Sequence, residues 1–170
     1  MAFSKIAAEN LGGSTLPALA GSSLTGISAG KVLQVLSGTL TNSNQSSTST
    51  SFVAFDIDVT ITPSATSSKI LVMMNGGQIY TNQDSKAVNI SIFRASTNLG
   101  HSTRGMGRYH VTDEQISAPH SFHFLDSPNS TSSLKYEGYF CSDDGTSVYA
   151  GTGSMGTMSI TVMEIGAWQI

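Results

Sequence analysis

The chain has few of the residues that cross-link, charge or anchor a protein. It holds one cysteine among 170 residues, so an internal disulfide is impossible, which argues against a disulfide-stapled secreted protein. Only 11% of its residues are charged, and its eight Lys and Arg residues are scattered over a net charge of −3. The sequence therefore has no cluster of basic residues of the kind that binds nucleic acid. No apolar run approaches the ~20 residues of a membrane span, so we expect neither nucleic acid nor membrane as a partner.

Signals for export, cofactors and metals are equally sparse. The N-terminus lacks the continuous apolar region of a signal peptide, so we expect a protein kept in a cytosol until assembly or lysis. Gly151–Gly156 matches G-x-G-x-x-G, but strand-like residues follow where a nucleotide site needs a helix. His120 and His123 are three apart, which sends them to opposite faces of one strand. We expect no cofactor and no metal site, with His120 in a loop and both histidines at the surface.

The sequence contains residues of the types used in catalysis, but they do not form a recognisable catalytic site. Asp56 and Asp58 alternate on one face of a strand, roughly 7 Å apart, a spacing that a glycosidase pair could use. Thr60 shares their face and no other acid is close in sequence, which favours a solvent-facing stripe. Cys141 has no neighbour that would activate a thiol, so it is interpreted as a small apolar side chain. We expect that the protein is not an enzyme.

The chain is instead rich in serine and threonine, and apolar and polar side chains alternate along its segments. Roughly a quarter of the residues are Ser or Thr, and Phe55–Ile61 alternates apolar with polar side chains, as a half-buried strand does. Repeated strands with turns every 8–12 residues predict an all-β fold, an antiparallel β-sandwich of jelly-roll type. The expected strands are 32–40, 52–61, 69–74 with a continuation at 78–80, 88–94, 121–125, 134–140, 147–150 and 157–165.

Four connections and one strand carry more detailed predictions. The polar tract 41–51 is expected to be a surface loop, and Asn75–Gly77 a bulge or bend. The Asp-Gly pair in 143–145 predicts a hairpin, with 147–150 pairing back on the preceding strand. The last strand, 157–165, is apolar on both faces near its end, so we expect it inside the sheet or under a neighbouring subunit.

Residues 1–30 differ from the rest of the chain. Their apolar residues lie between glycines at spacings that fit neither a helix nor a strand, and they are too few for a separate core. We interpret this segment as a docking or oligomerisation arm, with a disordered tail as the alternative, ahead of a sandwich domain at 31–170. The apolar residues of the arm are Ile6, Leu11, Leu16, Leu19, Leu24 and Ile27.

The segment 100–120 gathers three of the four histidines beside arginines and glycines. We expect a long exposed loop there, with at most one helical turn at 111–116. Its polar and aromatic side chains are candidates for receptor contacts, and a merely solvated loop is the alternative. The candidate receptor residues are His101, Arg104, Arg108, Tyr109 and His110.

Four tracts give the chain a resemblance. Taken in order, residues 61–72, 93–100, 124–131 and 159–165 resemble small virion proteins of tailed bacteriophages, especially aquatic ones, often described as tail-fibre-like. The resemblance covers about residues 30–166, and the arm is similar to segments of phage fibre proteins. It implies a non-enzymatic β-sandwich, commonly a homotrimer, displayed on the surface of the particle.

Two functions follow as hypotheses. The first is a tail-fibre or knob-like component that contacts a host surface glycan or protein through its loops. The second is a capsid decoration (cement) protein held on the capsid lattice by the arm. Both make the protein part of the virion, with itself and other virion proteins as partners, and the fibre-like arm favours the tail.

Overall fold

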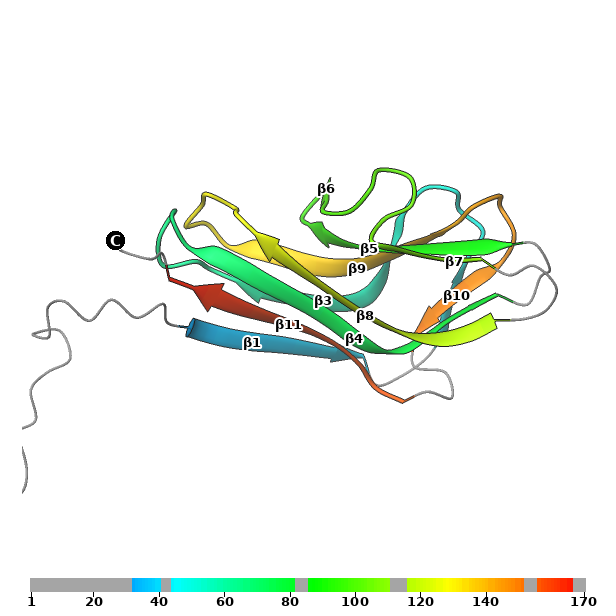
Figure 1. Ribbon diagram of the computed structural model, residues 1–170, viewed down its shortest axis with the longest axis horizontal. Coiled ribbons are helices and arrows are strands. Elements are labelled where there is room, and N and C mark those ends of the chain that lie inside the picture. Colours follow the sequence, from blue (N-terminus) through cyan, green and yellow to red (C-terminus); the bar gives the residue numbers. More distant parts are fainter. Residues whose placement is uncertain (1–31, 41–43, 82–85, 111–115, 152–155, 167–170) are drawn as a thin grey trace, which may run out of the picture. The chain divides into compact units, whose positions relative to one another are not determined.

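The computed structural model describes residues 32–40, 44–81, 86–110, 116–151 and 156–166, all within one compact unit, Gly30–Ala167. These residues form eleven strands and no helix (Figure 1). No helix in this part of the chain has the length and apolarity to cross a membrane. The strands are β1 (Val32–Leu40), β2 (Asn44–Ser47), β3 (Val53–Ile61), β4 (Lys69–Thr81), β5 (Ala87–Arg94), β6 (Thr97–Asn98), β7 (Gly107–His110), β8 (Ile116–Asp126), β9 (Leu134–Ser142), β10 (Val148–Gly151) and β11 (Met158–Ile165).

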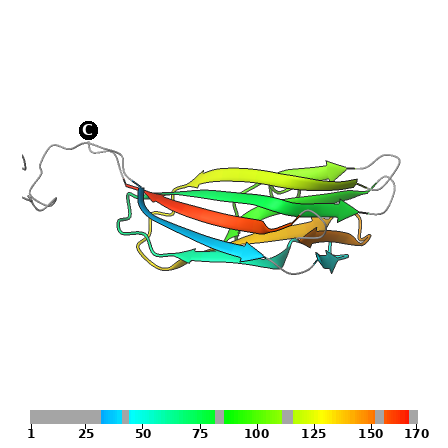
Figure 2. The same ribbon diagram turned by 90° about the horizontal axis from the view of Figure 1, so that it is seen from below.

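The strands form two antiparallel sheets packed face to face (Figure 2). In sheet A the four long strands follow the order β1-β11-β4-β8. Strand β10 pairs with the second half of β4, and β2 pairs with β10. In sheet B the order is β3-β9-β5, with β6 and β7 both paired to β5. The chain passes from sheet A to sheet B after β2, β4 and β8, and it returns to sheet A after β3, β7 and β9. This is the topology of a jelly roll, so the predicted fold class is confirmed.

The core lies between the sheets and follows from period-two alternation. In β3, Phe55, Ile57 and Val59 are buried while Asp56 and Asp58 are exposed. In β11 every second residue is buried, and the strand lies between β1 and β4, inside the sheet as expected. Apolar side chains on alternate positions of both sheets thereby meet in one continuous cluster, which supplies the driving force for packing the layers.

Strand β4 changes its partner at two glycines. β11 pairs with it as far as Gly76, and β10 pairs with it from Gln78 onward. Gly76 and Gly77 have φ of 86° and 58°, a region that favours glycine. A Cβ on Gly76 would lie 2.4 Å from the carbonyl oxygen of Thr157. The bulge predicted at this place is confirmed, and it lets one edge of β4 serve two strands.

Two predicted connections are wrong. Asn44–Ser47 lies in the expected surface loop but forms β2, which pairs with β10. Residues 147–150 do not pair back on β9, because β10 joins the opposite sheet beside β4 and β2. The Asp-Gly pair indicates a turn in the chain but does not indicate which strand the next segment pairs with. In its actual place, between β4 and β2, β10 buries Val148 and Ala150 in the core.

The prediction of a long exposed loop at 100–120 is also wrong for the C-terminal part of that segment. Gly107–His110 forms β7 against β5, and β8 begins at Ile116. His120 therefore lies in a strand, not in a loop, and is 4% exposed. Residues 111–115, which carry most of the expected helical turn, lie outside the described residues, as do residues 1–30 with the six apolar residues of the arm.

Candidate functional site

The compact unit has two distinguishable ends. Val32 pairs with Ile165, so β1 begins and β11 ends side by side (Figure 1). We call this the proximal end. At the opposite, distal end, β4 finishes at Thr81 and β5 begins at Ala87, close to the end of β9. The chain therefore enters and leaves the sandwich at the proximal end.

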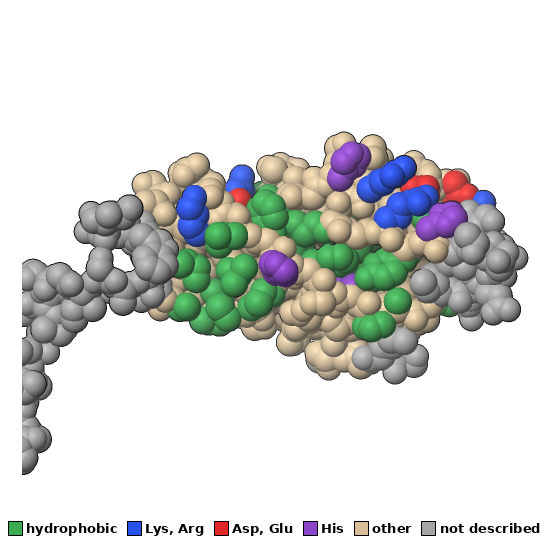
Figure 3. Space-filling view, viewed as in Figure 1, with side chains coloured by type: hydrophobic (Ala, Val, Ile, Leu, Met, Phe, Trp, Pro, Cys, Tyr) green, Lys and Arg blue, Asp and Glu red, His purple; other side chains and the backbone are tan. Residues whose placement is uncertain are grey.

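A cluster of charged side chains lies at the distal end, visible at the upper right of Figure 3. Arg108 donates to Asp143 over 2.7 Å, and Lys86 pairs with Asp144. The bond from Arg108 is the main cause that lowers the pKa of Asp143, and the charge of Arg104 adds to it. The bond from Lys86 lowers the pKa of Asp144 to about 2. We call Lys86, Arg104, Arg108, Asp143 and Asp144 the distal charged cluster.

The candidate receptor residues lie beside or within this cluster, with one exception. His101 and Arg104 are exposed on the β6–β7 connection, and β7 exposes Arg108 and His110. Tyr109, between them in β7, points the other way and packs against the core. Its hydroxyl donates to the carbonyl of Pro119 over 3.4 Å, and burial raises its pKa. Tyr109 is therefore an inward-facing residue of the sandwich.

The side chain of His101 is held in place by its own turn. His101 Nδ1 accepts hydrogen bonds from the backbone N–H groups of Thr103 and Arg104, at 3.2 and 3.3 Å. The ring thus caps the turn that presents Arg104. Nδ1 makes these bonds, and the side chain as a whole is exposed to solvent.

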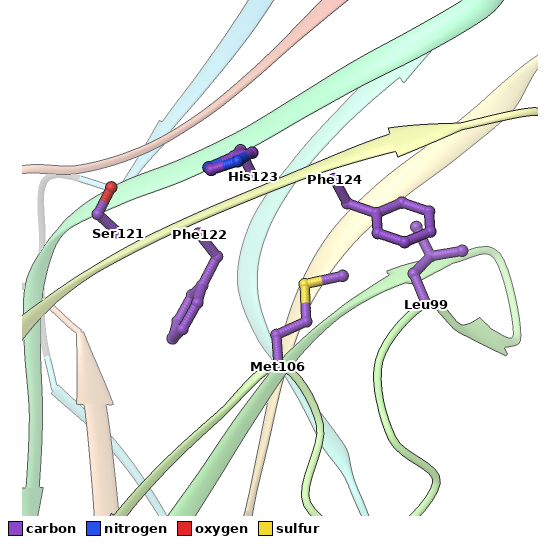
Figure 4. A pocket seen from close by; sticks show the side chains of 6 residues that line it. All are labelled: Leu99, Met106, Ser121, Phe122, His123 and Phe124. Carbon is purple, nitrogen blue, oxygen red and sulfur yellow. The ribbon is translucent and has the colours of Figure 1, made fainter.

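A pocket of about 310 Å³ opens between this connection and β8. In Figure 4, Phe122 and Phe124 of β8 point toward Met106 and Leu99, whereas Ser121 and His123 point to the other side of the strand. The ring of Phe122 lies directly over Gly107, where a Cβ would come within 2.4 Å of it. The sequence offered no signal for this pocket, because its two walls belong to different sheets and meet only when the sheets pack.

Other candidate residues are placed as follows. Asp56 and Asp58 share the outer face of sheet B as predicted, but each has its own partner. Asp56 accepts a hydrogen bond from Gln45 at 2.5 Å, and Asp58 lies 3.3 Å from Lys135. Cys141 is buried, which raises the pKa of its thiol. No three His, Cys, Asp or Glu side chains of the described residues come together as metal ligands.

His120 is a buried titratable group. It faces the interior and stacks on Phe122 at 5.5 Å, while His123 is exposed on the opposite face of β8. Within the described part of the chain, neither ring nitrogen of His120 has a hydrogen-bond partner. Burial lowers its pKa to about 4. The expectation that His120 is a surface histidine is wrong, because its phenyl neighbour and the facing sheet cover it.

The tracts that carry the phage resemblance contain two buried carboxylates. Asp126 accepts two bonds of 2.7 Å from Arg94, another from the Tyr136 hydroxyl and one from the Ser127 N–H. Because these residues belong to β5, β8 and β9, the network ties sheet A to sheet B. It is a structural element and lies apart from the distal charged cluster.

The second buried carboxylate is Glu164, which is held by uncharged donors. It accepts hydrogen bonds from Gln34, from Ser68 and from both the N–H and the hydroxyl of Ser64, at 2.6–2.7 Å. Burial raises the pKa of Glu164, but these bonds outweigh it and bring the pKa to about 2. The tract 61–72 thus closes onto β11 through hydroxyl groups.

Comparison with known proteins adds no identity. No protein-family model matches the sequence, and no curated protein matches it significantly.

Proposed function

We propose that the protein is a non-enzymatic structural component of a phage virion, a trimeric tail-fibre or knob-like subunit exposed on the particle and used in host attachment. The observation that carries the proposal is the separation of the two ends of the sandwich. The distal charged cluster lies at the end of the sandwich opposite to the one where β1 begins and β11 ends. A subunit attached through its chain ends would present this surface outward.

The side chains of this surface suit the binding of a ligand rather than the catalysis of a reaction. Arg104, Arg108 and His110 offer N–H donors, which match the hydroxyl, carboxylate or phosphate groups of a surface glycan. The neighbouring pocket, lined by Phe122 and Phe124, takes an apolar group. Ion pairs between Arg108 and Asp143 and between Lys86 and Asp144 tie the β9–β10 connection to β7 and to the start of β5, and a preorganised surface loses less entropy on binding.

Adsorption to the host tests this function. In phage particles carrying Arg104→Ala together with His110→Ala, we expect the adsorption rate to fall at least tenfold while particle yield stays the same. Lys135→Ala is the matched control, because it removes an exposed cation from sheet B far from the cluster. Adsorption that is unchanged in the double variant would refute a receptor role for this surface.

The second candidate is a capsid decoration protein anchored by residues 1–30. The six apolar residues of that segment favour it, because a purely solvating tail has no use for them. Quantitative mass spectrometry of purified particles separates the two candidates. A few to a few dozen copies per particle support the tail component, whereas one copy per major capsid subunit supports decoration.

A further inference from the structure

The sandwich is closed along one edge and open along the other. Strand β1, at one edge of sheet A, lies so close to β3 of sheet B that a Cβ on Gly38 would collide with the backbone carbonyl of Asp58. At the opposite edge, sheet A ends in β8 and sheet B ends in the short strands β6 and β7. The pocket beside β8 opens between the sheets at this second edge. We call it the β8 pocket, and it is lined by Leu99, Met106, Ser121, Phe122, His123 and Phe124.

Strand β8 offers backbone hydrogen-bonding groups to this pocket. Within the described residues, β8 pairs with β4 and with no other strand. Ser121 and His123 line the pocket although their side chains point to the other side of the strand (Figure 4), so the backbone forms this part of the wall. Every second residue of an edge strand directs both its N–H and its C=O away from the neighbouring strand. The wall therefore carries donors and acceptors that no neighbouring strand in the described part of the chain satisfies.

The rest of the β8 pocket is apolar. Phe122 and Phe124 are half-buried, and the side chains of Leu99 and Met106 face them from the β6–β7 connection (Figure 4). Phe122, Leu99 and Met106 pack against the core, which holds them in place. An apolar group of a ligand that enters between these side chains is removed from water, and this removal favours binding.

Charge and size restrict the ligand of the β8 pocket. None of its six lining residues is Asp, Glu, Lys or Arg, so a charged group would lose hydration there without gaining a counter-charge. The volume of about 310 Å³ lies at the lower end of the range for ligand pockets, about 300–1,000 Å³. The pocket therefore suits a small uncharged group that combines an apolar part with a hydrogen-bonding part.

An acetamido group meets all of these conditions. Its methyl group matches the apolar side chains, and its amide can donate to a free backbone C=O of β8 or accept from a free N–H. A sugar without this group brings hydroxyls but no methyl. A peptide would bring amides as an added strand, but the Tyr109 hydroxyl already donates to the Pro119 carbonyl and Pro119 has no N–H, which shortens the free edge.

We propose that the β8 pocket binds the acetamido group of an uncharged N-acetylhexosamine residue. The methyl group lies among Phe122, Phe124 and Met106, and the amide forms hydrogen bonds with the free backbone edge of β8. The inference rests on the proposed function for the source of this sugar, a glycan of the host surface, and it names the chemical group that the attachment surface selects.

The test titrates the full-length, ¹⁵N-labelled chain with two methyl glycosides and follows its NMR spectrum. Methyl N-acetyl-β-glucosaminide carries the acetamido group, and methyl β-glucoside has a hydroxyl in its place. We expect the Kd of the first to be at least about tenfold lower, because one amide hydrogen bond and one buried methyl group are gained. The backbone amide signals of residues 121–124 should shift as this glycoside binds.

A pair of variants locates the binding. Phe124→Ala should raise the Kd for the acetamido glycoside at least about fivefold, because the methyl group loses an aromatic wall. Phe124 is not part of the core cluster, so the variant should keep the circular dichroism of the folded subunit. Leu125→Ala is the matched control, because Leu125 is the next residue of β8, is 55% exposed and lines no part of the pocket. It should leave the Kd unchanged.

Three results would overturn the proposal: equal affinity for the two glycosides, an unchanged Kd in Phe124→Ala, and shifts confined to amides outside β8. If neither glycoside binds and a blocked peptide of alternating Val and Thr shifts the amides of 121–124, the edge binds a protein segment and the sugar is rejected.

Adsorption of the Arg104 and His110 double variant is measured separately, so the two failures are distinguishable. Reduced adsorption of that variant without sugar binding would reject the acetamido site and retain the attachment role. Sugar binding with unchanged adsorption would retain the acetamido site and reject the attachment role of the distal charged cluster.

Discussion

Acid should destabilise the subunit through one residue, His120. The side chain is 4% exposed, and within the described residues its ring nitrogens have no hydrogen-bond partner. Burial lowers its pKa from 6.5 to about 4 because the charged form loses hydration that nothing replaces. The unfolded chain therefore binds a proton between pH 6.5 and 4 that the folded subunit refuses. Stability is full above pH 6.5 and falls as the pH drops through this window.

The magnitude follows from the two pKa values. Between pH 7 and pH 5 the unfolded state gains about 2 kcal/mol from protonating this one imidazole, and the full loss below pH 4 is about 3 kcal/mol. Glu164 contributes little in that interval. Its pKa is lowered from 4.5 to about 2, so the stability it adds is lost only as the pH falls below about 4.5.

Denaturant unfolding at pH 7 and pH 5, at one fixed protein concentration, measures the effect. We expect the free energy of unfolding to drop by about 2 kcal/mol more in the unmodified protein than in His120→Gln, which cannot titrate. His123→Gln is the matched control, because His123 lies on the same strand but is exposed, and it should behave as the unmodified protein. A pH difference that is the same in His120→Gln and the unmodified protein would refute the reasoning.

Two further predictions concern the buried carboxylates. Arg94→Met should cost about 3 kcal/mol of unfolding free energy, because it leaves Asp126 buried without its cation; Lys135→Met, at an exposed pair, should cost less than about 1 kcal/mol. Equal costs in denaturant unfolding would contradict the role given to the buried pair. Ser68→Ala should cost about 1–2 kcal/mol and raise the pKa of Glu164 by removing a 2.6 Å donor, so that acid unfolding begins at higher pH. Exposed Ser67→Ala should change neither, and an acid transition shared by both serine variants would disprove the assignment.

Strand positions and faces were predictable because they depend on local alternation. The pattern around Phe55 and Ile57 needs only one buried face to be correct, and the structure buries those side chains and exposes Asp56 and Asp58 between them. The bulge at Gly76–Gly77 was also predictable, because positive φ favours glycine. The presence of His101, Arg104, Arg108 and His110 near one another followed from their proximity in sequence.

Partner choice between strands was not predictable in the same way. A turn at Asp144–Gly145 says that the chain reverses, but it does not say that β10 will join the opposite sheet. A short polar strand such as β7 looks like a loop until a neighbouring strand offers backbone partners and a core for Tyr109. Tertiary packing supplies these terms, and they outweigh the weak local preferences of such segments.

The amino-acid sequence by itself determined that this chain is all-β, where most strands lie, and which side chains alternate, because these depend on neighbours along the chain. Only the tertiary structure decided what meets across the sheets. It buried His120, joined Arg94 to Asp126, gathered Lys86 and Arg108 with two aspartates, and aligned Val35, Met163, Leu71 and Leu125 in one row. Strand register sets these contacts, and register is chosen by burial over the whole sandwich rather than by any one segment.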